Sequence, residues 1–296
     1  MKVPGSWTAF AILLVVVSAV AVYQQSAHQS DRIVQYPIER TLKYSFTVKN
    51  PHGHAVNDAE LWIYSPIKES AFQHLATLTA SLPYNKGYDA QGNERMEFVL
   101  DTLPPYAAKT ISVTAKVNLS EQGNKIERIK SEAYLNDDKF VDLDSAEIQK
   151  VARRLKADTA KETVDGIYKW ITKNITKSGY VMRDLGARYA LKTKSGDCTE
   201  FMYLFSALAR ANGIPTRNLA GFVASENKVL RAADYHNWNE VYIDGEWYLV
   251  DADKQVFMEK SSEYIAMRLI VDATAGQSTD HQHFFSSSSE IQVLMN

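Results

Sequence analysis

Cysteine is nearly absent from this sequence: Cys198 is the single one among 296 residues. One cysteine cannot form an internal disulfide, so the stability of the fold must come from packing. A cysteine that serves only packing would be buried and would behave as a small apolar side chain. In an oxidising compartment, however, a lone thiol is open to oxidation, and its presence then calls for a chemical explanation.

An excess of charge of either sign is also missing. The sequence has 33 Lys and Arg against 35 Asp and Glu, a net charge of -2. Such a balance supplies no basic field for phosphate groups, so we expect no nucleic-acid partner. The sequence contains neither a phosphate-binding glycine loop nor a Gly-x-Ser-x-Gly elbow, which argues against nucleotide enzymes and serine hydrolases.

Charged side chains are scarce at the N-terminus, where Lys2 is the only one in the first thirty residues and residues 7–22 are almost all apolar. This apolar run falls between the roughly 7–15 residues of a signal-peptide core and the ~20 residues of a membrane span. Ala19 and Ala21 suit a cleavage site, whereas residues 24–30 suit a tether after an uncleaved anchor, so both alternatives stay open. The positive-inside bias predicts that the rest of the chain is extracytoplasmic, in the periplasm or cell envelope.

Apolar and polar residues alternate in the first third of the chain, as in β-strands with one buried face. Four runs show this period, namely Leu42 to Val48, Leu61 to Ile63, Met96 to Leu100 and Ile111 to Val117. After the N-terminal segment of residues 1–30, we therefore predict a small all-β, sandwich-like domain over residues 31–120. Residues 66–95 show no clear pattern, and residues 121–143 are predicted to be a connector.

Helix-start signals appear in the second half of the chain. Residues 144–147 and 159–162 resemble capping boxes, and each precedes apolar residues at helical spacing. A further helix is predicted to begin near Cys198 and to end before Gly213, with Pro215 preventing its continuation. A thiol in the first turn of a helix meets unpaired backbone N–H groups, which favour the thiolate and could also bind an oxyanion.

A two-residue hairpin is predicted at Asp244-Gly245. Three cross-strand pairs follow from this turn: Ile243 with Glu246, Trp238 with Asp251, and His236 with Asp253. Diagonal neighbours on one face of a strand pair lie about 7–8 Å apart at Cα, so the side chains of His236 and Asp251 can meet. Asp253 would lie directly opposite His236, so hairpin geometry alone leaves both carboxylates as candidate partners.

Four motifs occur in a fixed order: Gly196-Asp197-Cys198-Thr199-Glu200-Phe201, Gly213-Ile214-Pro215-Thr216-Arg217, His236-Asn237-Trp238 and Trp247-Tyr248-Leu249-Val250-Asp251. Together they resemble the transglutaminase-like core. The resemblance is strong over residues 195–253 and weaker back to about residue 144. It implies an α+β, papain-like fold over residues 144–296, in which the nucleophile helix packs on an antiparallel sheet. It also implies Asp251 as the catalytic carboxylate, because the aspartate of the family follows a tryptophan by four residues, as Asp251 follows Trp247.

The predicted active site is therefore a catalytic triad of Cys198, His236 and Asp251. The chemistry implied is acyl transfer from a peptide or carboxamide through a thioester, ending in hydrolysis or in transfer to an amine, with hydrolysis slightly favoured. Trp238 is predicted to pack beside the triad or only in the core, and Tyr180 to add an oxyanion donor. The resemblance implies no cofactor, and the sequence shows no complete metal site and no calcium loop.

The alternative from another class is a non-catalytic binding or scaffold module of the cell envelope, against which the intact triad argues. Expected partners are a protein or peptide substrate, and the membrane if the N-terminal segment is uncleaved. The pairs His52-x-His54 and His281-x-His283 lack further ligands nearby, so we expect loop histidines there.

Overall fold

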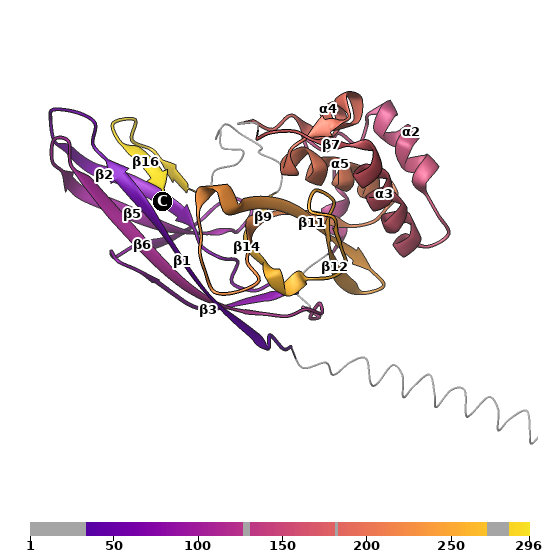
Figure 1. Cartoon of the computed structure of the whole chain (residues 1–296), viewed down its shortest axis with the longest axis horizontal. Coiled ribbons are helices and arrows are strands. Elements are labelled where there is room, and N and C mark those ends of the chain that lie inside the picture. Colours follow the sequence, from indigo (N-terminus) through magenta and orange to yellow (C-terminus); the bar gives the residue numbers. More distant parts are fainter. Residues whose placement is uncertain (1–33, 127–130, 181–182, 271–283) are drawn as a thin grey trace, which may run out of the picture. The chain divides into compact units, whose positions relative to one another are not determined.

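The structure is a computed structural model that describes residues 34–126, 131–180, 183–270 and 284–296 (Figure 1). Residues 1–35 and 36–296 form two separate units, and the description below concerns the second. The predicted signal or anchor segment, residues 1–30, lies outside the described residues. Within the described ranges, no helix is long and apolar enough to cross a membrane.

The predicted all-β region consists of two antiparallel sheets. One contains β1 (Ile38–Lys49), β6 (Ala108–Leu119) and β3 (Gln73–Ala80), and the other contains β2 (Val56–Tyr64), β5 (Glu94–Leu103) and β4 (Asn85–Tyr88). The apolar positions of the alternating runs are buried and share one core between the sheets, including Leu42, Phe46, Leu61, Phe98 and Ile111. This interdigitation of two inner faces is how a sandwich buries its apolar side chains.

Residues 66–95, which show no clear sequence pattern, contain β3 and β4. Most of the side chains of β3 are half-buried or exposed, and β4 has only four residues. Leu75 and Leu78 of β3 pack against the core three residues apart, because the register shifts between Leu75 and Thr77, and the four residues of β4 are too few to show a period. The sequence therefore does not reveal these two strands.

Three strands from the second half of the chain extend the sandwich sheets. β10 (Lys228–Val229) pairs in parallel with β1, β15 (Phe284–Ser286) pairs with β2, and β16 (Gln292–Met295) pairs with β1. Figure 1 shows β16 beside these N-terminal strands. The end of the stretch predicted as the catalytic domain, residues 144–296, thus completes the sandwich. The domain boundaries themselves stay a prediction.

The second half of the chain has the predicted α+β architecture. A five-stranded antiparallel sheet has the order β13-β12-β11-β9-β14. Its strands are β9 (Thr216–Val223), β11 (Tyr235–Ile243), β12 (Glu246–Asp251), β13 (Val256–Phe257) and β14 (Tyr264–Ile270). The buried helix α5 (Cys198–Arg210) packs against β11 and β9, which confirms the predicted packing of this helix on an antiparallel sheet.

The other helices of this half pack against α5, and the remaining elements are short. These elements are the helices α2 (Ala146–Leu155), α3 (Ala160–Asn174) and α4 (Gly186–Thr193), the short pair β7 (Thr176–Lys177) and β8 (Ser195–Gly196), and the single turns η1 (Ser131–Leu135), η2 (Ala232–Asp234) and η3 (Ser261–Glu263). The helix starts agree with the sequence signals, because Ser145 caps α2 and Thr159 forms a capping box with Glu162 at α3. The hairpin is also confirmed: Ile243 pairs with Glu246, and both turn residues have positive φ.

Candidate active site

Cys198 is the first residue of α5. The preceding Asp197 caps the helix by accepting a hydrogen bond from the backbone N–H of Thr199 at 2.9 Å, and Glu200 closes a capping box with Asp197. The approach to the helix is fixed as well, because β8 pairs with β7 just before Cys198. Local sequence therefore determines where the thiol lies.

His236 lies near the start of β11, and its Nε2 contacts Oδ2 of Asp251 at 2.6 Å. Both residues are buried, with 5% and 1% of their surface exposed. Asp251 accepts two further hydrogen bonds, from the hydroxyl of Tyr264 at 2.8 Å and from the backbone N–H of Lys254 at 2.9 Å. Burial alone would raise the pKa of Asp251, but these partners, His236 first, hold that pKa below its usual value.

Asp253, the other carboxylate that the hairpin leaves open, makes a different contact. Its Oδ2 pairs with Nζ of Lys177 at 2.7 Å. The β11–β12 register ends at Asn239 and Val250, so the two predicted pairs beyond it, Trp238 with Asp251 and His236 with Asp253, are not part of the ladder. The reason is that the chain turns directly after β12, where Asp251 accepts from Lys254.

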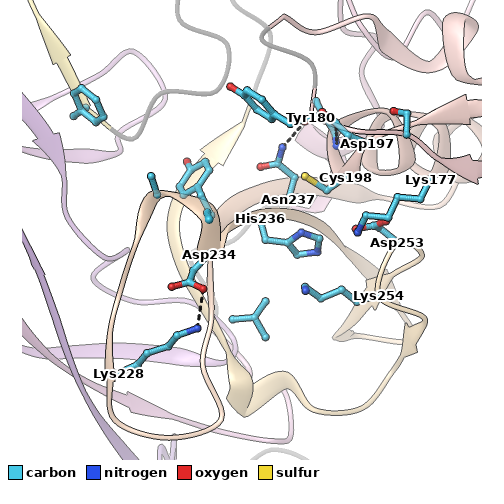
Figure 2. A pocket seen from close by; sticks show the side chains of 17 residues that line it. Lys177, Tyr180, Asp197, Cys198, Lys228, Asp234, His236, Asn237, Asp253 and Lys254 are labelled. Carbon is cyan, nitrogen blue, oxygen red and sulfur yellow. Dashed lines mark hydrogen bonds and ion pairs between the residues drawn. The ribbon is translucent and has the colours of Figure 1, made fainter. Parts of the chain in front are cut away.

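A cavity of about 830 Å³ brings Cys198 and His236 together (Figure 2). Ligand pockets commonly have a volume of roughly 300–1,000 Å³. Other side chains of the lining are those of Lys177, Tyr180, Asn237, Asp253 and Lys254, and two lining residues, Lys228 of β10 and Phe284 of β15, belong to strands of the sandwich sheets. The sandwich therefore contributes to the wall of this cavity.

The ionisation of Cys198 differs from the expectation for a helix start. Burial raises the pKa of the Cys198 thiol to about 12, and the carboxylates of Asp197 and Asp253 act in the same direction. Hydrogen bonds from the backbone of Asn237 and from Thr199 lower the pKa, but they do not outweigh burial. The predicted lowering of the thiol pKa is therefore wrong for the resting site, and the sulfur carries its proton at neutral pH.

The two supporting residues lie in different surroundings. Tyr180 is 75% exposed and lines the cavity, whereas Trp238 is buried. The ring of Trp238 packs edge-on against Tyr264, with the centroids 5.1 Å apart, so it is one side chain removed from Asp251. Their proposed roles stay predictions.

Sequence reasoning missed Tyr264 and the polar role of Asn237. Tyr264 belongs to β14, after the last recognised motif, and nothing in the local pattern says which carboxylate its hydroxyl meets. Asn237 belongs to the His236-Asn237-Trp238 motif, and this position was a signal that it takes part in the site. Its amide nitrogen donates to the hydroxyl of Thr199 at 2.8 Å, which connects the histidine strand to the nucleophile helix.

The histidine pairs are separate from this cavity. His52 and His54 lie in the segment after β1, where His54 contacts Glu290 at 3.0 Å. Among the residues that the structure describes, no group of three or more His, Cys, Asp or Glu has an arrangement suited to a metal. His281 and His283 lie outside the described residues.

Comparison with known proteins agrees with this architecture. The sequence model of the transglutaminase-like superfamily matches residues 149–252. A solved structure of a presumed cysteine protease from Cytophaga hutchinsonii is similar over 88% of this chain and 92% of its own, with a TM-score of 0.56 and 19% identity. The periplasmic domain of TgpA from Pseudomonas aeruginosa covers 72% of this chain and 88% of its own, with a TM-score of 0.39 and 15% identity. No curated protein matches significantly.

The first of these structures shows that the fold is shared well beyond residues 149–252, because the alignment covers most of both chains. The matched stretch of residues 149–252 includes Cys198, His236 and Asp251. Residues 149–252 therefore match the transglutaminase-like superfamily, within a chain of α+β fold.

Proposed function

We propose that the protein is a thiol-dependent acyl-transfer enzyme, a cysteine peptidase or amidase or a protein transglutaminase, that acts on peptides or carboxamides. Cys198 is the nucleophile, His236 the general base and acid, and Asp251 the residue that orients the imidazole. The observation that carries the proposal is the 2.6 Å contact of His236 Nε2 with Asp251, next to the cavity that Cys198 also lines.

In the proposed mechanism, Asp251 accepts the Nε2–H of His236, which leaves the lone pair on Nδ1. Nδ1 removes the proton of Cys198 while the sulfur forms a bond to the substrate carbonyl carbon. The imidazolium then gives this proton to the departing amine as the C–N bond breaks, and a thioester remains. Attack by water, which loses a proton to Nδ1, releases the acid and restores the thiol.

In the first step, the sulfur attacks either as a preformed thiolate or as a thiol that loses its proton during the attack. The high pKa of Cys198 favours the second version. A preformed thiolate needs a pKa below the working pH, and burial acts against that. We therefore propose that the proton leaves only as the sulfur attacks, with His236 as general base. Backbone N–H groups in the first turn of α5 are the candidate donors to the oxyanion, with Tyr180 as a further candidate.

Hydrolysis is the proposed outcome, because water is the default acceptor of a thioester. The description of the Cytophaga hutchinsonii protein as a presumed cysteine protease agrees with this choice. We also propose an extracytoplasmic location, which rests on the apolar segment of residues 7–22 with Lys2 before it.

Alkylation of the single thiol tests the chemistry with the full chain. The rate with iodoacetamide is measured against pH for the unchanged protein and for His236→Ala, and a peptide library is assayed by mass spectrometry with and without an added primary amine. We expect His236→Ala to slow alkylation near neutral pH, and cleavage that Cys198→Ser abolishes. A thiol indifferent to His236, together with no product from any peptide, would instead favour the non-catalytic binding module.

A further inference from the structure

The nitrogen and the oxygen of the Asn237 side-chain amide have different surroundings. The residue is 3% exposed and lines the cavity beside Cys198. Its nitrogen donates to Thr199, whereas its Oδ1 is buried and accepts no hydrogen bond from the residues that the structure describes. Figure 2 shows the amide of Asn237 between Cys198 and Tyr180, with a dashed hydrogen bond at its nitrogen and the oxygen directed away from that bond. A buried acceptor without a donor is costly, so this oxygen requires an explanation.

A neighbouring residue shows that the strand itself does not require such an oxygen. Asn239, two residues further along β11, is also buried, but its amide nitrogen donates to the backbone of Met202 and to the side chain of Asn218. Its side-chain oxygen is not among the buried atoms without a partner, and the residue does not line the cavity. Asn237 differs from Asn239 in that it lines the cavity, where a ligand can supply the missing donor.

The position of Asn237 indicates which part of a substrate it meets. Successive side chains of a strand point to opposite faces, so the side chains of Asn237 and His236 approach Cys198 from opposite sides. In the proposed mechanism the leaving amine takes its proton from His236 and therefore departs on the histidine side. The acyl group that stays on the sulfur is left on the side of Asn237.

We propose that Oδ1 of Asn237 is an acyl-side subsite that accepts a hydrogen bond from the peptide N–H adjacent to the attacked carbonyl. This inference rests on the proposed function and narrows its substrate class. A main-chain peptide carries such an N–H next to its carbonyl. In the side-chain carboxamide of glutamine or asparagine, a carbon atom stands in the place of that nitrogen. The subsite thus selects peptide bonds over side-chain carboxamides, as a peptidase requires.

The test uses two peptidyl chloromethyl ketones that differ only in a methyl group on the amide nitrogen next to the ketone. Their rates of alkylation of Cys198 in the full-length protein are divided by their rates with glutathione, which removes the intrinsic difference. We expect the N–H probe to react about tenfold faster than the N-methyl probe, as one hydrogen bond to a buried acceptor allows. Asn237→Ala should reduce this ratio to about one.

Two variants separate recognition from structure. Asn237→Asp keeps an oxygen at the subsite and should keep the preference for the N–H probe. Asn239→Ala removes a buried amide from the same strand and should also keep it. Equal rates with the two probes in the unchanged protein would overturn the subsite, and so would a loss of preference in Asn239→Ala. If neither ketone reacts with Cys198 faster than with glutathione, the proposed function fails first, and the subsite with it.

Discussion

Tyr264 and His236 donate to the same oxygen of one carboxylate, Oδ2 of Asp251, at 2.8 and 2.6 Å. The two donors compete for the negative charge of that oxygen. Each of these hydrogen bonds lowers the pKa of Asp251, so Tyr264 helps to keep the carboxylate ionised where it contacts the imidazole.

Tyr264→Phe should therefore raise the pKa of Asp251, because the Tyr264 hydroxyl is one of the groups that lower it, and should move the acid loss of kcat/KM, or of the alkylation rate, to higher pH. The lost hydrogen bond to a charged group should also lower the free energy of unfolding by about 1.5–3 kcal/mol. A pH profile and urea unfolding measure the two effects.

Tyr64→Phe is the matched control, because Tyr64 donates to a carboxylate of Asp89 at 3.0 Å in the sandwich. It should cost stability without moving the pH profile. A profile that Tyr264→Phe leaves in place would contradict the shared-oxygen argument.

Asp253→Asn should lower the pKa of Cys198, because the Asp253 carboxylate is one of the groups that raise it. More thiolate at a given alkaline pH means faster alkylation, and titration of the thiolate absorbance gives the shift directly. Asp234, paired with Lys228 at 3.1 Å on another wall of the cavity, supplies the control. Asp234→Asn should leave the thiol pKa unchanged, and an equal shift in both variants would refute a specific effect of Asp253.

Asp251→Asn should lower kcat/KM at least about a hundredfold, since the imidazole loses the charge that fixes and stabilises it.

Asp251→Asn should also change the stability of the fold at acid pH. The pKa of Asp251 is lower in the folded state than in the unfolded chain, so its contribution is present above about pH 4 and is lost as the pH falls through the folded value. Unfolding measured from neutral pH to about pH 2 should show a shallower acid decline in the variant. A decline as steep as in the unchanged protein would contradict this assignment.

Gly221 on β9 pairs with His236, and a Cβ there would come within 2.0 Å of the backbone oxygen of Ile265 on β14. Gly221→Ala should separate β9 from β14, displace Tyr264 and cost at least about 1–3 kcal/mol. Gly166→Ala in α3 meets only an ordinary contact at 3.6 Å and should instead add about 0.5–1 kcal/mol. Thermal unfolding of both variants measures these changes, and equal stabilities would contradict the close approach of β14 to Gly221.

The sequence predicts those parts of the site that depend on local patterns. Asp197, Cys198 and Glu200 lie within one helical turn, so the capping box and the helix start can be read directly. The tight turn at Asp244 likewise brings the strand of His236 next to that of Asp251. Hairpin geometry leaves open which carboxylate contacts His236, whereas the resemblance implies Asp251, the carboxylate that His236 contacts.

What depends on distant contacts could not be predicted. The pKa of Cys198 follows from its depth in the fold and from Asp253, which is 55 residues away in the sequence. Tyr264 reaches Asp251 only because β14 pairs with β9 at the edge of the same sheet. The short strands β10 and β16 show no alternation of apolar and polar residues that would predict their pairing with β1.

One edge of β1 is shared by β10, which carries Lys228 of the cavity wall, and by β16, in which Met295 pairs with Phe46. During synthesis, Cys198 and His236 are made well before residues 292–295. Pairing between such distant segments is slow, because the chain between them must first be closed into a loop. The edge of β1 that holds Lys228 at the cavity is therefore also the edge of a slow, long-range pairing with β16.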